Sequence, residues 1–269
     1  MERKFCVSKL SNIPQIQNFI KYRFLLKELI VKDLKVKYKR SILGVFWTLL
    51  NPLFYMIILN LVFSTIFTTT ISNFPVYLLC GSVLFGFFSE STSAAMTSVY
   101  SNATLLTKVY IPKYLFPLSK VIFSLVNLFI SLVALVIVMI FTDAPFHPTM
   151  WWFIIPIAYL FIFSLGIGLL LSSAAVFFRD LTHLYGIVLT ALQFLTPLFY
   201  PVDILPDYIK PYVEANPIYQ AIYMLRQLVL YNEFPTFMQH LNLFIYSMAV
   251  LLLGLFVFYK KQDRFVLYA

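Results

Sequence analysis

The sequence predicts an all-α polytopic membrane protein with six transmembrane helices. Hydrophobic residues make up 61% of the 269 positions and charged residues only 12%, and the mean hydropathy is +0.86. A chain of this composition cannot fold with a water-facing exterior. One span takes about twenty apolar residues, so six spans occupy roughly half of the chain. Loops and surface helices take the remainder, and positions 1–269 therefore form a single transmembrane domain.

Six apolar runs are long enough to cross a bilayer, and their flanking charges give the direction of crossing. Six crossings put both termini on one side, and eighteen of the twenty Lys and Arg residues fall on that side. The other side carries only Lys210 and Arg226. By the positive-inside rule both termini are cytoplasmic, with a basic tail at 1–41, the membrane domain at 45–259 and a second tail at 260–269. The six runs are 45–68, 75–98, 116–141, 150–177, 182–200 and 239–259.

A basic amphipathic helix is expected at 20–40, directly before the first run. Leu26, Leu29, Ile30 and Leu34 form an apolar stripe on it. Such a helix lies in the membrane plane beside anionic lipid headgroups, and the same surface can also hold a soluble partner. Nucleic acid is not expected despite the net charge of +9, because the cations adjoin apolar spans. The basic residues of this interface helix are Lys27, Lys32, Lys35, Lys39 and Arg40.

The segment SNATLLTKVYIPKYLFPL (101–118) joins the second and third runs and is too short and too basic to cross. Asn102 is a possible N-cap for a short helix that Pro112 ends. This cytoplasmic elbow is either a stiff connector or a lever that inserts into a moving partner. At the end of the fourth run, Asp180 can cap the next helix and Arg179 can anchor at the headgroups.

The segment 196–235, between the fifth and sixth runs, contains six prolines and four acidic residues. It carries two short helical patterns, near 203–214 and 217–231. The second begins at the pair Asn216–Pro217 and is too short to cross alone, so we expect it to dip into the outer leaflet and return. This apolar surface favours two re-entrant gate helices within 201–235 over a passive connector. The gate residues are Asp203, Pro206, Asn216, Pro217, Tyr219 and Arg226.

Polar residues recur at helical spacing in several runs. The third run carries Lys120, Ser124, Asn127 and Ser131. Lipid cannot solvate such a stripe, so it either hydrogen-bonds neighbouring helices or faces a channel. The fourth run carries small residues that let another helix approach closely. These are Ser164, Gly168 and Ser172.

Aromatic residues make up 19% of the chain. Their rings offer flat apolar faces with polar edges, which suit a sugar chain that slides without being gripped. Interfacial belts account for aromatic residues equally well. A mixed aromatic and polar set from the first and fifth runs is the candidate channel lining. The set is Trp47, Phe54, Asn60, Phe63, Tyr185, Gln193, Thr196 and Tyr200.

The sequence contains no recognisable catalytic or nucleotide-binding motif. Glu90 is the only carboxylate well inside a run, and pairing with Lys120 or nearby hydroxyls is a more ordinary role for it than ion coupling. The three histidines lack metal-ligand spacing, and no disulfide is expected between Cys6 and Cys80. No GxxxxGKS or GxxxxGKT loop is present. We therefore expect no enzyme activity, metal or cofactor on this chain, and any ATP that drives it is bound by another chain.

Six segments occur in an order that resembles the membrane subunits of bacterial ATP-binding-cassette exporters for cell-surface polysaccharides. That family includes the permeases for O-antigen, capsule and wall teichoic acid, and the resemblance covers about 24–264. The segments are the basic helix, LGVFWTLLNPL (43–53), NATLLTKVYIPKYLFPLS (102–119), FFRD (177–180), TPLFYPVDILP (196–206) and NPIY (216–219).

The resemblance implies a homodimer in the bacterial cell membrane whose two six-helix halves enclose a channel. Two cytoplasmic ATPase subunits, which bind ATP and Mg, would sit beneath it, and a lipid-linked glycan would be the cargo. By similarity, 101–112 is the coupling helix, the basic segment is an interface helix, and 203–231 supplies the gate helices. The residues expected to couple to the ATPase are Asn102, Leu105, Leu106, Lys108, Val109, Tyr110, Arg179 and Asp180.

Three alternatives stay open from sequence alone. A drug or lipid exporter permease of the same superfamily shares the topology, although the order of motifs argues against it. An ion-coupled carrier would work without an ATPase, but it usually needs more than one ionisable residue deep in the bilayer. A membrane-embedded transferase would need acidic, His or metal-binding residues at a loop mouth, and the sequence lacks that set.

Overall fold

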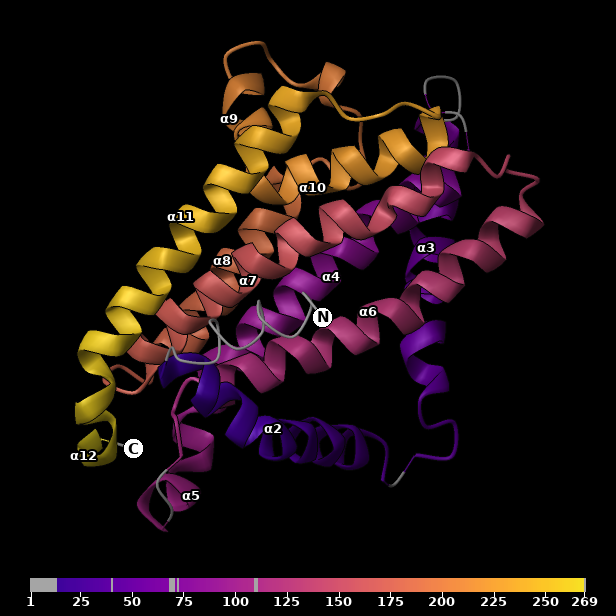
Figure 1. Ribbon diagram of the computed structural model, residues 1–269. Coiled ribbons are helices and arrows are strands. Elements are labelled where there is room, and N and C mark those ends of the chain that lie inside the picture. The colour runs from indigo at the N-terminus through magenta and orange to yellow at the C-terminus, as the bar shows by residue number, and fades with distance from the viewer. Residues whose placement is uncertain (1–13, 40, 68–70, 72, 109–110, 269) are drawn as a thin grey trace, which may run out of the picture.

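All regular secondary structure is helical in the part of the chain that the computed structural model describes (Figure 1). No strand occurs within those ranges. Arg40, Val109 and Tyr110, which the sequence assigns to partner contacts, lie outside the described residues, and so does Cys6. The described residues are 14–39, 41–67, 71, 73–108 and 111–268.

The molecule has two ends, which differ in the helices that they contain. In Figure 1, α2, α5 and α12 gather at one end, called the α2 end below, while α9 and α10 lie at the opposite, α10 end. The long helices are α2 (Pro14–Tyr38), α3 (Phe46–Phe67), α4 (Phe74–Ser98), α6 (Leu115–Phe141), α7 (Ile154–Ala175), α8 (Leu181–Leu195) and α11 (Phe237–Lys261). The short elements are η1 (Tyr100–Asn102), α5 (Ala103–Lys108), η2 (Pro148–Phe153), η3 (Val202–Ile204), α9 (Lys210–Glu214), α10 (Pro217–Arg226), the π-helical turn η4 (Gln227–Tyr231), η5 (Gln262–Arg264) and α12 (Phe265–Tyr268).

Among the described residues, five helical stretches are long and apolar enough to cross a membrane. The predicted fifth run, 182–200, instead forms α8, which has 15 residues. Such a helix rises only about 22 Å, short of the roughly 30 Å hydrocarbon core. It ends at Leu195 because Pro197 disfavours a helical conformation at Thr196, which is extended. The five stretches are Phe46–Phe63, Phe74–Ser98, Leu115–Phe141, Pro148–Ala175 and Phe237–Arg264.

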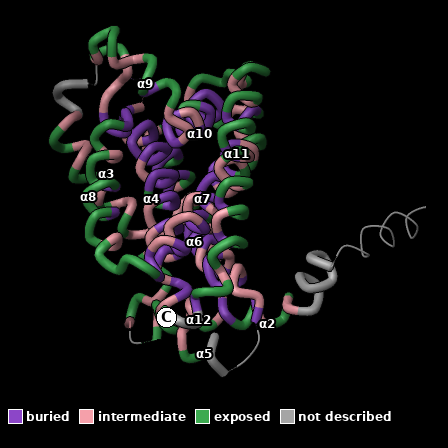
Figure 2. Tube along the Cα trace, turned by 90° about the vertical axis from the view of Figure 1, so that its left-hand side faces the viewer, coloured by how far each residue is buried: buried purple, intermediate pink, exposed green. Residues whose placement is uncertain are grey.

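Helix α4 is the centre of the bundle. Buried residues make up 72% of its span, against 6% for the span in α3. Helices α6 and α7 pack on either side of α4, and α11 packs against α7. Figure 2 shows the buried residues concentrated along α4, α7 and α10, with exposed residues along α3 and α8. Helix α3 therefore stands at the edge of the bundle.

Small residues set the closest helix contacts. A Cβ on Gly168 would lie 2.8 Å from Cβ of Ala95, so α7 and α4 meet at the small-residue stripe that the sequence predicts. Ser164 and Ser172 of that stripe are fully buried. A second close contact joins α7 to α11, where a Cβ on Gly254 would lie 2.5 Å from the carbonyl oxygen of Gly166. The sequence analysis does not anticipate this second contact.

Helix α2 lies along the α2 end with one face inward. Leu26 and Leu29 are buried in a cluster that includes Val99, Phe116 and Phe265. The cations of the opposite face remain in solvent, as amphipathic spacing requires. Of the predicted interface lysines, Lys27, Lys32 and Lys35 of α2 are exposed, and so is Lys39 directly after the helix.

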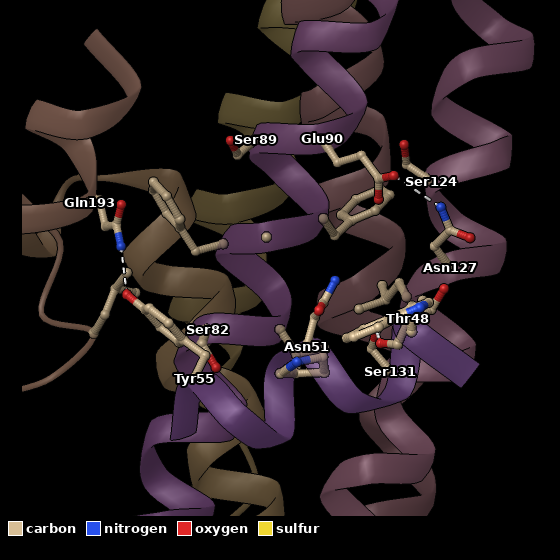
Figure 3. Close-up of a pocket in the computed structure, with 18 of the residues that line it drawn as sticks. Thr48, Asn51, Tyr55, Ser82, Ser89, Glu90, Ser124, Asn127, Ser131 and Gln193 are labelled. Atoms are coloured by element: carbon tan, nitrogen blue, oxygen red, sulfur yellow. Dashed lines mark hydrogen bonds between the residues drawn. The ribbon is translucent and has the colours of Figure 1, made fainter. Parts of the chain in front are cut away.

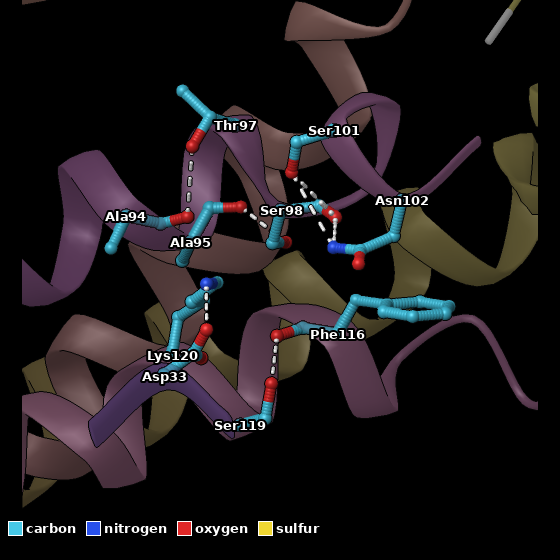
Figure 4. A network of polar contacts seen from close by, with 10 residues as sticks. All are labelled: Asp33, Ala94, Ala95, Thr97, Ser98, Ser101, Asn102, Phe116, Ser119 and Lys120. Carbon is cyan, nitrogen blue, oxygen red and sulfur yellow. Dashed lines mark hydrogen bonds and ion pairs between the residues drawn. The ribbon is translucent and has the colours of Figure 1, made fainter. Parts of the chain in front are cut away.

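Asn102, the predicted N-cap residue of the elbow, lies between α4 and α5. This residue belongs to the 3-10 turn η1, and its Nδ2 donates to the carbonyl oxygen of Ser98 at 2.8 Å (Figure 4). Asn102 directly precedes α5, the position of an N-cap residue, and its Nδ2 meets a carbonyl at the C-terminal end of α4. Asp180 occupies the predicted N-cap position of α8, but its side chain makes no capping hydrogen bond.

The external segment forms one of its two predicted helices. The single helix expected at 203–214 is wrong: η3 and α9 replace it, because Pro206 forces the preceding Leu205 into an extended conformation. The second helix forms as α10 and continues through η4. It starts as predicted, with Pro217 in its first turn and Asn216 Oδ1 accepting from the backbone N–H of Ile218 at 3.0 Å.

Candidate functional site

A cavity of about 770 Å³ lies between α3 and the rest of the bundle (Figure 3). We call it the central cavity. Lys37 and Tyr38, at the C-terminal end of α2, line it at the α2 end, and Leu198, in the segment after α8, lines it at the other. Helices α3, α4, α6 and α8 supply the remaining wall. Its polar lining from these four helices is Thr48, Asn51, Tyr55, Ser82, Ser89, Glu90, Ser124, Asn127, Ser131 and Gln193.

Helical spacing explains why these polar groups converge. Residues three and four apart share one face of a helix. On α6 that rule groups Ser124, Asn127 and Ser131, which the sequence identifies as a stripe, and all three line the cavity. Lys120, the fourth member, does not. Its Nζ pairs with Asp33 of α2 at 2.8 Å (Figure 4).

Helix α3 contributes a second polar face, which the sequence analysis does not identify. Thr48, Asn51 and Tyr55 follow the same steps of three and four and line the cavity. Pro52 lies inside this helix and lacks the N–H that the carbonyl of Thr48 would otherwise accept. Ser131 Oγ of α6 donates to that carbonyl at 3.2 Å. Ser131 of α6 thus supplies the hydrogen bond that Pro52 of α3 cannot donate.

Glu90 of α4 anchors a polar network at the α2 end of the cavity. Its Oε1 accepts from Lys37 Nζ at 2.7 Å and from Asn127 Nδ2 at 3.0 Å. Tyr38 hydrogen-bonds Thr48 and donates more weakly to Asn127 Oδ1, at 3.4 Å. The partner of Glu90 is therefore Lys37 of the interface helix, and the sequence-based pairing with Lys120 is wrong. The network joins α2, α3, α4 and α6.

Two of the eight candidate channel residues line the cavity. Trp47 does so on α3, and Gln193 does so on α8, where its Nε2 donates to Tyr55 OH at 2.7 Å. Phe54 lies exposed on α3, and Asn60 is half-buried on the same helix.

The other four candidate residues lie in packing contacts outside the cavity lining. Phe63 stacks on Phe199, with ring centroids 6.4 Å apart. Tyr185 is buried and its OH donates to Thr92 Oγ1 at 2.6 Å. Thr196 is buried and accepts from Asn216 Nδ2 at 3.1 Å, while Tyr200 OH donates to the carbonyl of Phe194 at 2.7 Å.

The candidate coupling segment α5, as far as the structure describes it, lies at the α2 end. Leu105 of α5 is half-buried against the cluster beneath α2. Leu106 and Lys108 belong to the same short helix. Arg179 is exposed, with its guanidinium 5.9 Å from the ring centre of Tyr100.

Arg226 joins three segments at the α10 end through hydrogen bonds to backbone carbonyls. It is 1% exposed, and Nη1 donates to the carbonyl of Pro197 at 2.9 Å. Nη2 donates to the carbonyls of Leu198 at 2.9 Å and Tyr77 at 3.3 Å. The guanidinium carbon lies 3.4 Å from the ring centre of Tyr77. Arg226 therefore pins α10 to α4 and to the segment after α8.

The remaining candidate gate residues differ in burial. Asp203 and Pro206 are exposed, Pro217 is half-buried and Tyr219 is buried. No group of three His, Cys, Asp or Glu residues with metal-binding geometry occurs among the described residues.

A bundle of apolar helices around a polar, ion-paired cavity, with a basic amphipathic helix at one end, is typical of a multi-pass membrane protein. The chain matches the model of the ABC-2 type transporter family over residues 25–230. It belongs to that family.

Named relatives narrow the class further. The chain is 32% identical over 221 residues to "O-antigen export system permease protein RfbA" of Myxococcus xanthus, covering 78% of this chain and 84% of the relative. It is 28% identical over 236 residues to a protein of the same name from Klebsiella pneumoniae, covering 87% and 90%. It is 22% identical over 242 residues to "Polysialic acid transport protein KpsM" of Escherichia coli, covering 87% and 92%. These similarities agree with the family that the sequence motifs indicate.

Proposed function

We propose that this chain is the channel-forming permease subunit of an ATP-driven exporter that moves a lipid-linked polysaccharide, or a teichoic-acid-like polymer, out of the cytoplasm. The observation that carries the proposal is the central cavity. Ten polar side chains from four helices line it within an otherwise apolar bundle, and lipid would solvate them poorly. A polymer rich in hydroxyl groups matches that lining.

The open side of the cavity supports a homodimer. Asn51 lines the cavity and is nevertheless exposed, on a helix whose span is only 6% buried. Helix α8 likewise has only Tyr185 and Leu189 buried. An exposed polar group in the middle of a span is costly in lipid. A second copy placed against α3 and α8 would cover it and convert two open cavities into one enclosed channel.

The distribution of charge supports a membrane topology for this dimer. We place both termini in the cytoplasm of a bacterium, with the α2 end facing inward. The charge distribution supports this placement, because eighteen of twenty cations group on that side of the predicted topology. Helix α8, extended by 196–200, would complete the sixth crossing where the bilayer adapts to its short length.

The α2 end offers a surface on which an ATPase subunit could dock. Lys27, Lys32, Lys35, Lys39 and the elbow helix α5 are cytoplasmic in this topology. They would receive two copies of an ATP-binding-cassette ATPase, which bind ATP and Mg and perform the hydrolysis. Nucleotide closure would push α5 and α2 together, and α2 is joined directly to the cavity by Lys37 and Glu90.

Reconstitution tests the proposal against its alternatives. The purified chain and its ATPase partner would be placed in proteoliposomes with the lipid-linked glycan on the ATPase side. We expect ATP-dependent appearance of glycan on the opposite side, and none with a hydrolysis-deficient ATPase. Transport of a lipid or drug without glycan would favour the alternative exporter, and transport driven by an ion gradient alone would favour a carrier.

A further inference from the structure

A second cavity, of about 530 Å³, lies at the α10 end. Residues from α4, α9, α10, η4, α11 and the segment after α8 line it. Its chemistry is carried by Asp203, Glu214, Tyr223, Tyr231, Gln239 and Asn242. A cavity of this size falls in the range of small-ligand sites, about 300–1,000 Å³.

The second cavity is separated from the central cavity by one thin partition. Leu198 lines the central cavity and Pro201 lines the second, so the segment 197–201 stands between them. Arg226 holds that segment through the carbonyls of Pro197 and Leu198. A polymer leaving the central cavity at this end would therefore leave close to the second cavity.

The second cavity is lined by one cation, Arg226, and by two carboxylates that do not pair with it. Arg226 lines the cavity, is 1% exposed, and has no carboxylate ion pair within the described part of the chain. Its Nε is buried without a hydrogen-bond partner. Asp203 and Glu214 line the same cavity and form none of the ion pairs seen among the described residues. Both carboxylates are thus free to accept hydrogen bonds from a ligand.

Aromatic and amide groups complete the lining. Tyr223 and Tyr231 are 37% and 42% exposed, and Asn242 on α11 is exposed as well. Aromatic faces pack against the C–H faces of sugar rings, while carboxylates and amides pair with adjacent hydroxyls. Phosphate or acidic sugars are disfavoured, because two carboxylates line the cavity and the bonded N–H groups of Arg226 already donate to backbone carbonyls.

We propose that the second cavity is a saccharide subsite that holds a neutral or amino-bearing stretch of the glycan as it leaves the central cavity. The inference rests on the proposed function for the identity of the polymer, and it adds a second binding site and the charge class of the sugars bound there. Weak binding is required at such a site, since a tight grip would arrest a moving chain.

Saturation-transfer NMR on the full permease and ATPase complex tests this subsite. The complex would be held in a detergent without a sugar headgroup. The probes are the methyl glycosides of glucose, galactose, rhamnose, glucosamine and N-acetylglucosamine, with the methyl glycoside of glucuronic acid as the acidic comparison. The variants are Tyr223→Ala and Asp203→Asn. The matched controls are Tyr208→Ala and Glu233→Gln, whose side chains are exposed at the same end and do not line the cavity.

We expect at least one neutral or amino glycoside to bind, and Tyr223→Ala to weaken it about two- to tenfold, the effect of losing one aromatic contact. Asp203→Asn should weaken an amino glycoside most, and both controls should match the wild type. The inference is overturned if no glycoside binds, if only the glucuronide binds, or if Tyr223→Ala and Tyr208→Ala behave alike. Reconstituted glycan export is read separately: export with no glycoside binding rejects the subsite alone, and glycoside binding without export rejects the proposed function alone.

Discussion

Lys37 Nζ lies 2.7 Å from Glu90 Oε1 and joins the C-terminal end of α2 to α4 at one end of the central cavity. Both side chains are more than a third exposed, at 38% and 37%. Such a pair contributes at most about 1 kcal/mol to stability, and less after solvent screening. Its position is therefore more important than its strength, because it links α2, the helix proposed to face the ATPase, to the wall of the cavity.

Charge exchange tests this link. Lys37→Glu and Glu90→Lys each place like charges beside one another, and we expect each to reduce export at least about fivefold, the lower range of coupling between sites. The double exchange restores an attractive pair and should restore most of the export. Surface glycan, normalised to the amount of permease in the membrane, is the measurement. A double variant as inactive as the singles would show that the pair itself is not what matters.

A substitution at Gly81 tests the contacts by which Arg226 joins α10 to α4 and to the segment after α8. A Cβ at this position would lie 2.8 Å from Arg226 Nη2 and 3.3 Å from the carbonyl oxygen of Leu198. Gly81→Ala should therefore destabilise the protein by about 1–3 kcal/mol through overpacking, seen as a lower Tm of the purified permease.

Gly86 on the same helix is the matched control. No atom lies within 4 Å of a Cβ built there. Gly86→Ala should leave stability unchanged or raise it by about 0.5–1 kcal/mol, because alanine favours a helix. Equal Tm values for the two alanine variants would contradict the close approach of Arg226 to α4.

Pro52 and Ser131 are expected to be energetically coupled. Ser131→Ala leaves the carbonyl of Thr48 without the hydrogen bond at 3.2 Å that compensates for the missing N–H of the proline. The expected cost is about 0.5–1.5 kcal/mol. In a Pro52→Ala background the helix regains its own hydrogen bond, so the cost of Ser131→Ala should fall to near zero. Denaturation of all four forms gives the coupling energy directly, and additive costs would contradict the assignment.

The elbow helix is expected to transmit force. Lys108→Glu reverses a charge at the end of α5, so we expect near-normal insertion, continued ATP hydrolysis and export lowered at least about fivefold. ATPase activity and export would be measured in the same proteoliposomes. Lys210→Glu, at the α10 end, is the charge-matched control. Full export by the Lys108→Glu complex would mean that α5 is only a connector.

Much of the helix pattern could be predicted from the sequence, because local rules decide it. The stripe Ser124, Asn127 and Ser131 follows helical spacing and lines the cavity. The start of α10 at Asn216 follows from one cap and one proline. Where a proline changes the backbone, the prediction could have been improved: Pro197 ends α8, and Pro206 divides the first gate helix.

The cavity lining was harder to predict, because it depends on how each helix is rotated. Tyr185 and Gln193 both lie on α8, yet one is buried against Thr92 and the other faces Tyr55. The pairing of Glu90 with Lys37 joins residues 53 positions apart, and no local pattern selects Lys37 over Lys120. The polar spacing of Thr48, Asn51 and Tyr55 was a usable signal in the first run.

Photo-cross-linking in the working complex tests most directly whether the central cavity carries the glycan. Tyr55, which lines the cavity, and Phe129, which is 39% exposed on α6 and does not line it, would each be replaced by p-benzoylphenylalanine. We predict that illumination during ATP turnover attaches glycan to the permease at position 55 and not at position 129, and that a hydrolysis-deficient ATPase removes the signal. Glycan attached equally at both positions, or at neither while export continues, would contradict a path through the central cavity.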